Sequence, residues 1–262
     1  MKKFFYLFKV SLEKVFKERF RYKFNTFSNI LILYILFMAM FAGIKGFGIQ
    51  MGVSPINMED TLEGFIIGYF LWTIMMMAYS DIAYTIVSDA NRGTLEQLNM
   101  SDISLAFILT TKSFANLLLD YLISIILLFI IMNSTGYWID INIFSIIVPI
   151  FIGIFSILGI GLVCGGLALI FKKVQSLLNV IQYFLIALLM GNTNRLVTTV
   201  LPFRLAVEKV YMMVFGGHSL SDFSLLDYGM MIGNSILYFS IGLVVFNQCV
   251  KLAKNKGLLG QY

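Results

Sequence analysis

The sequence predicts an all-α membrane protein with six transmembrane helices. Of its 262 residues, 59% are apolar and only 13% are charged, whereas a soluble domain is about 45–50% apolar and about 25% charged. So few charged residues cannot cover a water-facing surface. The apolar residues form long continuous runs, which favours spanning helices over the alternating ten-residue segments of a β-barrel.

Six apolar runs account for most of the chain, and we expect each to cross the membrane once. They are residues 27–48, 62–84, 114–132, 144–171, 177–190 and 228–250. The fifth run is short, since a spanning helix takes about 20 residues. Residues 1–262 are therefore expected to form a single transmembrane domain with a six-span bundle over 27–250, and no length remains for a soluble catalytic domain.

The basic residues predict the orientation of this bundle. Fifteen of the 19 lysines and arginines precede the first run, follow the last, or fall between runs two and three or four and five. The other four are Lys45, Arg195, Arg204 and Lys209. Because cytoplasmic loops carry the excess of basic residues, we expect both termini in the cytoplasm, with 251–262 as a cytoplasmic tail.

The segment before the first run, residues 1–24, has the pattern of an amphipathic helix. Its apolar stripe consists of Phe4, Phe5, Phe8, Leu12, Val15 and Phe16. Lysines occupy the opposite face, as in helices that lie on an anionic membrane surface. A helix packed on a partner protein has the same pattern, but we favour the membrane surface because the first apolar run follows directly.

The loop between the second and third runs carries the clearest local motif. Gly93 can turn the chain, and Thr94 with Gln97 has the spacing of a capping box, which predicts a short helix at about 95–100. Leu95 and Leu98 are possible contact residues and Glu96 a possible pairing charge. From the residues alone, a helix that docks on a partner and one that has no partner remain equally open.

A resemblance favours the docking helix. Gly93-Thr94-Leu95-Glu96-Gln97-Leu98 followed by Asp102-Ile103-Ser104 resembles the G-T-L-E-Q-L and P-I-S stretches of ABC-2 type permeases, with aspartate where that family often has proline. In that family the segment is the coupling helix, which contacts the ATPase subunit. The resemblance therefore implies that residues 92–98, Arg92 included, couple this chain to an ATPase.

Weaker similarities extend the resemblance along the chain. Residues 1–24 are similar to the elbow helix of the family, 171–179 to its basic connector into the fifth span, and 256–260 to a common tail. Leu201-Pro202-Phe203 with Gly216-Gly217 resembles its external region. The resemblance thus implies short re-entrant helices between the fifth and sixth spans.

The chain contains no Gly-Lys pair and hence no G-x-x-x-x-G-K-[ST] phosphate loop. ATP and Mg²⁺ would therefore be bound by a separate ATPase, and we expect no cofactor on this chain and no enzyme activity of its own. The resemblance implies two ATPase subunits, a second permease subunit in a homodimer or heterodimer, and a bacterial cytoplasmic membrane. We expect membrane lipids, and no nucleic acid, as other partners, and an apolar or amphipathic substrate (drug, peptide or lipid-like) that moves outward.

Polar residues within or beside the apolar runs are candidates for the translocation path, because they are costly in lipid. We select Asp120, Asn179, Gln182 and Asn192. For Asp120 we favour pairing across helices, or with Lys112, over substrate contact. The alternative function, a gradient-driven secondary transporter or channel, would use Asp120 as its proton site. His218 is the only histidine, so no metal site is expected.

The fourth run has a face of small residues, which predicts close helix packing without any ligand. The glycines on it are Gly153, Gly159, Gly161, Gly165 and Gly166.

Overall fold

The computed structural model describes residues 2–51, 62–189 and 195–257, and every regular element in these ranges is a helix. The helices are α1 (Lys2–Arg21), α2 (Lys23–Met51), α3 (Leu62–Asn91), α4 (Leu95–Asn99), α5 (Leu105–Thr135), α6 (Ile143–Phe171), α7 (Gln175–Leu189), α8 (Arg195–Val200), α9 (Arg204–Phe215), the 3₁₀ turn η1 (Leu220–Asp222) and α10 (Leu225–Asn255). The all-α prediction is confirmed for these residues.

Within the described residues, five helices are long and apolar enough to cross a membrane: most of α2, and all of α3, α5, α6 and α10. Each contains one of the predicted runs. The fifth run corresponds to α7, which has 15 residues and is therefore about 22 Å long, less than the roughly 30 Å of a hydrocarbon core. Five of the six predicted spans thus have the required length.

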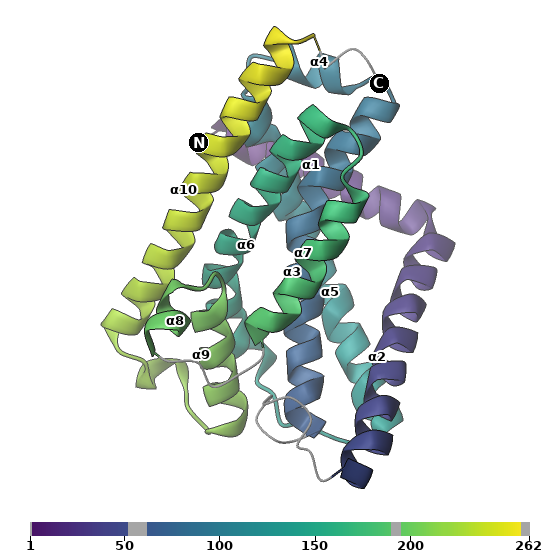
Figure 1. The fold of residues 1–262 in the computed structure, drawn as a ribbon, viewed down its shortest axis with the longest axis vertical. Coiled ribbons are helices and arrows are strands. Elements are labelled where there is room, and N and C mark those ends of the chain that lie inside the picture. The colour runs from purple at the N-terminus through teal and green to yellow at the C-terminus, as the bar shows by residue number, and fades with distance from the viewer. Residues whose placement is uncertain (1, 52–61, 190–194, 258–262) are drawn as a thin grey trace.

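The long helices form a bundle around α6, which packs against α3 on one side and α10 on the other (Figure 1). Small residues allow this contact. A Cβ on Gly161 would lie 2.9 Å from the carbonyl oxygen of Tyr79 in α3, and one on Gly159 would collide with that of Tyr238 in α10. Close packing at these glycines is therefore confirmed, but they do not form a single face, since Gly161 meets α3 and Gly159 meets α10.

The two ends of the bundle differ. The short helix α4 and the last turns of α10 lie at one end, whereas α8 and α9 lie beside α6 and α10 toward the other (Figure 1). At that second end α9 packs on α6 with Ala206 against Gly153. Lys209 of α9 is buried and forms an ion pair of 2.9 Å with Asp227 at the start of α10.

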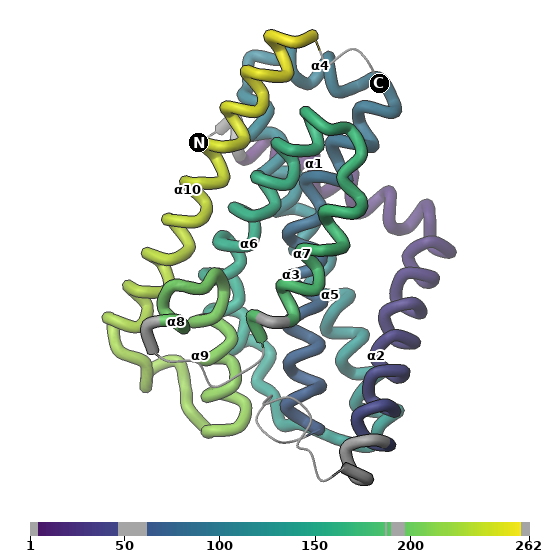
Figure 2. Tube along the Cα trace, in the orientation of Figure 1, coloured from purple at the N-terminus to yellow at the C-terminus, as the bar shows by residue number. Residues whose placement is uncertain are grey.

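Helix α2 is the least enclosed of the long helices, with 17% of its apolar segment buried. Near the middle of α2, Phe37 is fully buried and stacks on Phe65 of α3, and the carbonyl oxygen of Leu33 accepts a hydrogen bond of 2.6 Å from the Tyr69 hydroxyl. Its N-terminal half stands farther from the bundle (Figure 2). The middle of α2 is therefore anchored, and a cavity separates its N-terminal half from α3 and α5.

Helix α1 runs across the bundle instead of along it (Figure 2). It packs mainly on α5. The backbone continues from α1 into α2 with a sharp change of direction at Tyr22. This arrangement agrees with a helix that lies flat at a membrane surface and leads into a span.

Candidate functional site

The predicted loop helix is present as α4, Leu95–Asn99, and Gly93 takes the left-handed conformation (φ +70°) that turns the chain into it. The predicted capping box is wrong. Thr94 has helical backbone angles (φ −92°, ψ −13°) and makes no side-chain cap, whereas an N-cap residue needs an extended backbone. The Thr94 hydroxyl instead donates back to the carbonyl oxygen of Asp89, at 3.1 Å.

The side chains of α4 divide into an anchoring set and an exposed set. Leu95 is only 1% exposed, and Leu98 packs against the same core. Glu96 and Gln97 are exposed. The expectation that Leu95 contacts a partner is therefore wrong, because the chain's own core covers it. Surface available for docking is left at Glu96 and Gln97. Arg92 is also exposed, but it lines a cavity beside α1.

Asp89 joins α4 to the bundle. Its carbonyl oxygen accepts the Thr94 N–H at 2.8 Å, and its carboxylate lies 3.4 Å from the ammonium group of Lys112 in α5. The contacts of Asp89 thus link α3 both to α5 and to the turn that precedes α4. A force on α4 would be transmitted directly to these two long helices.

The predicted apolar stripe of α1 is divided between the bundle and the outside. Phe8 lies against Phe114 of α5, with ring centroids 5.7 Å apart, Leu12 is half-buried, and Val15 is 4% exposed. Phe5 and Phe16 are 64% and 53% exposed. The side chain of Phe4 lies outside the described part of the structure. The stripe therefore has one edge on α5 and one edge free to meet lipid.

Asp120 is buried in α5 and pairs with Arg19 of α1, at 2.5 Å from guanidinium nitrogen to carboxylate oxygen. Pairing across helices is therefore confirmed, and the Lys112 alternative is wrong because Lys112 is turned toward Asp89. One turn away, Asn116 donates a hydrogen bond of 2.7 Å to Asp81 of α3. Sequence reasoning missed Arg19 and Asn116, since neither partnership has a local signal.

The remaining path candidates do not gather around Asp120. Asn179 is on the exposed side of α7 and accepts from Gln175 at 3.1 Å. Gln182 is half-buried, and Asn192 lies outside the described residues. The cavity that Asp120 lines, of about 380 Å³, has no residue of α7 in its wall. This cavity therefore joins Asp120 to α2 and α3 and not to α7.

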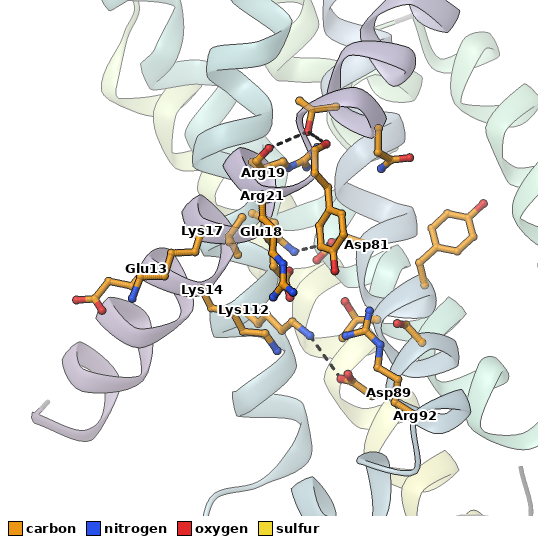
Figure 3. A pocket seen from close by; sticks show the side chains of 18 of the residues that line it. Glu13, Lys14, Lys17, Glu18, Arg19, Arg21, Asp81, Asp89, Arg92 and Lys112 are labelled. Carbon is orange, nitrogen blue, oxygen red and sulfur yellow. Dashed lines mark hydrogen bonds and ion pairs between the residues drawn. The ribbon is translucent and has the colours of Figure 1, made fainter.

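A cavity of about 960 Å³ lies between α1, the start of α2, and the α4 ends of α3 and α5. Figure 3 shows Lys14, Arg21, Arg92 and Lys112 with their nitrogen-bearing ends toward one space, and Glu13 pointing away from it. Arg19 and Asp81 lie deeper in its wall. No sequence motif marks this cavity, because its wall comes from four separate segments.

A second basic residue that sequence reasoning missed is Arg204, at the start of α9. Its guanidinium donates to the carbonyl oxygens of Leu188 and Leu189, at 3.1 and 2.9 Å. These are the last carbonyls of α7, which have no partner within their own helix. Arg204 therefore caps the short helix α7 from outside.

Within the described residues no group of three or more His, Cys, Asp and Glu side chains is arranged to hold a metal ion. The fold and its five long apolar helices define the chain as a multi-pass α-helical membrane protein. Comparisons with models of protein families, with curated proteins and with solved structures found no match.

Proposed function

We propose that this chain is the membrane-spanning subunit of an ATP-binding-cassette exporter, powered by a separate ATPase that docks on α4. The observation that carries the proposal is the construction of α4: a helix with exposed Glu96 and Gln97, fixed to the bundle by buried Leu95 and the Asp89 contacts. A short helix held in this way suits the transfer of motion from a soluble partner to α3 and α5. The G-T-L-E-Q-L resemblance falls on the same residues.

The complete exporter would need a sixth crossing, which we assign to α7. The chain leaves α6 at the α4 end of the bundle, and α7 runs from there toward the end at which α10 begins (Figure 1). Irregular backbone at membrane depth must be shielded by protein, and the Arg204 cap on α7 together with the packing of α9 on α6 supports that role. In this proposal α8 and α9 are the re-entrant helices and form an outer gate.

The working assembly would contain two permease subunits and two ATPases in a bacterial cytoplasmic membrane, with both termini in the cytoplasm. The cargo would be apolar or amphipathic and would move outward. The interior described here supports this class, since it is composed mainly of aliphatic and aromatic side chains, as in pockets for apolar ligands.

The test is to tag the carboxyl terminus, extract the protein gently from its native membrane, and assay vanadate-sensitive ATPase activity that co-purifies with it. The variant Glu96→Ala/Gln97→Ala removes two exposed side chains of α4 and leaves the anchor Leu95 in place. We expect it to lose the ATPase subunit while keeping its own folding, measured as thermal midpoint.

The matched control is Asn133→Ala/Asp140→Ala, which alters two exposed residues where α5 leads into α6, at the other end of the bundle. The control should retain the ATPase. Purification of the intact protein without ATPase from several mild detergents and nanodiscs would reject the proposal and favour gradient-driven transport.

A further inference from the structure

Two cavities of opposite character adjoin beneath α1. The first is the charged cavity of about 960 Å³ described above. The second, of about 380 Å³, lies between α2, α3 and α5 and has a mainly apolar wall that includes Ile30, Leu33, Met76, Met77 and Ile123. Arg19, Thr26, Asp81 and Tyr84 line both cavities, so the two share a boundary.

The charged cavity has an excess of positive charge. Six basic residues line it (Lys14, Lys17, Arg19, Arg21, Arg92 and Lys112), against four acidic ones (Glu13, Glu18, Asp81 and Asp89). Arg19 and Lys112 form ion pairs, but among the described residues Lys14, Arg21 and Arg92 form none. Asp120, which lines the adjoining cavity, offsets Arg19 as its ion-pair partner, so the two cavities together carry one excess positive charge. This excess matches a ligand that carries one negative charge.

The chemistry of the free basic groups favours a phosphate. A guanidinium presents its N–H groups as a planar fork that fits a phosphate in a bidentate manner. Arg21 and Arg92 face the cavity from opposite sides, from α1 and from the end of α3 (Figure 3). An apolar cavity directly beside a phosphate site calls for a ligand with an apolar portion.

We propose that the two cavities together bind an anionic phospholipid. Its phosphate lies among Lys14, Arg21, Arg92 and Lys112, and an acyl chain enters the apolar cavity between α2 and α3. The position of α1 supports this assignment, since an amphipathic helix lies at the level of lipid head groups. The site belongs to the chain alone, so the proposal does not depend on the exporter function.

The test measures lipid binding to the purified full-length chain by native mass spectrometry. Dioleoyl phosphatidic acid and dioleoyl phosphatidylcholine are titrated separately after delipidation. We expect phosphatidic acid to bind at least about tenfold more tightly, because only its head group has net negative charge to match the cavity. Equal affinities for the two lipids would overturn the proposal.

The variant Arg21→Gln/Arg92→Gln should weaken phosphatidic acid binding by at least about tenfold, because two charge-assisted contacts are lost. Both side chains are exposed, so the fold should be unaffected, which the thermal midpoint checks. Lys14→Gln is a second, milder variant in the same wall. The control is Lys251→Gln/Lys254→Gln, which removes two exposed charges from α10. If the variant and the control lost phosphatidic acid affinity equally, the effect would come from general surface charge, and the proposed site would be rejected.

Two further probes separate a lipid from a soluble phosphate compound. Dihexanoyl phosphatidic acid has the same head group with short chains and should bind at least about tenfold more weakly, since each buried methylene contributes to affinity. Inorganic phosphate at millimolar concentration should not displace the long-chain lipid. If both short-chain lipid and inorganic phosphate compete fully, the site binds a soluble anion and the lipid proposal fails.

Discussion

At the scale of single residues, the contact that most affects the placement of α1 is the Arg19–Asp120 ion pair. Its partners are 101 residues apart in sequence, and the Asp120 side chain is only 7% exposed. Removing one partner leaves the other charge poorly solvated and unpaired. The free-energy cost of that unpaired charge exceeds the net stabilisation that the intact pair contributes. Breaking the pair by removing one partner is therefore expected to weaken the contact of α1 with α5, to which Phe8 also contributes.

We predict that Asp120→Asn lowers the free energy of unfolding by about 2 kcal/mol, since it leaves Arg19 without its carboxylate in a partly buried place. Thermal unfolding of the purified protein measures this change. In a double-mutant cycle, Arg19→Gln should cost less in the Asp120→Asn background than alone. Lys9→Gln is the matched control, because Lys9 is exposed on α1, forms no described ion pair and does not line the proposed lipid site. An unchanged midpoint together with loss of gradient-driven transport would instead assign Asp120 to proton coupling.

The residue scale is also where sequence reasoning failed most often. Thr94 and Gln97 have the spacing of a capping box, but the tight turn at Gly93 places Thr94 in helical conformation and directs its hydroxyl to Asp89. The spacing of Thr94 and Gln97 shows only that a capping box is locally possible. The hydrogen bond that the Thr94 hydroxyl makes depends on the direction in which the chain leaves α3. The outward position expected for Leu95 fails for a similar reason, since an apolar residue on a five-residue helix has no periodicity that reveals its buried side.

At the scale of elements, α6 organises the bundle because its glycines let two neighbouring helices approach closely. The close packing was predictable from the sequence, because five glycines in one apolar helix leave room for neighbouring backbones that larger side chains would fill. The sides of α6 on which they lie were not, since Gly161 meets α3 and Gly159 meets α10. The existence and order of the long helices were predictable too, since apolar runs dictate them. The sequence did not predict that α3 extends to Asn91 or that α5 begins at Leu105, because helix ends beyond the lipid are set by packing with α4 and α1.

We predict that Gly159→Ala destabilises the protein by about 2–3 kcal/mol or prevents its accumulation. A Cβ there would collide with the carbonyl oxygen of Tyr238, so α6 and α10 would have to separate along their contact. The control is Gly233→Ala in α10, which has open space around the new methyl group and should raise stability slightly through helix propensity. Thermal midpoints of the two variants should therefore move in opposite directions, and equal shifts would contradict the packing argument.

We predict that Arg204→Gln loosens the C-terminal end of α7 specifically. The two hydrogen bonds from Arg204 to Leu188 and Leu189 satisfy carbonyls that the helix itself leaves free. Their loss should raise amide exchange in the last turn of α7 by about tenfold, as local opening becomes easier. Hydrogen–deuterium exchange measures this, with α6 peptides as the internal reference. Uniform acceleration across both helices would mean global destabilisation and not a lost cap.

At the scale of the whole molecule, the two ends of the bundle carry different helices. The basic amphipathic α1, the loop helix α4 and the lysine-bearing end of α10 lie toward one end, and α8 and α9 toward the other (Figure 1). The positive-inside rule predicts that the basic end faces the cytoplasm. The proposed ATPase contact and the proposed lipid site would then both be on the cytoplasmic side, where ATP and an anionic leaflet are found.

The number of crossings follows from a labelling experiment, because each crossing changes the side of every later residue. In a Cys164→Ala/Cys249→Ala background, which removes both natural thiols, single cysteines are placed at Glu96, Asp140 and Ser219, all exposed. Intact cells are treated with a membrane-impermeant maleimide. We expect Asp140→Cys and Ser219→Cys to react from outside, and Glu96→Cys only after permeabilisation.

The Ser219 position decides whether α7 crosses the membrane. Asp140 and Ser219 are separated by α6 and α7, so two crossings return Ser219 to the side of Asp140. If α7 did not cross, Ser219 would react with the same sidedness as Glu96, and α10 would carry the carboxyl terminus to the outside. That result would leave five spans, contradict the cytoplasmic carboxyl terminus, and remove the structural basis for an outer gate formed by α8 and α9.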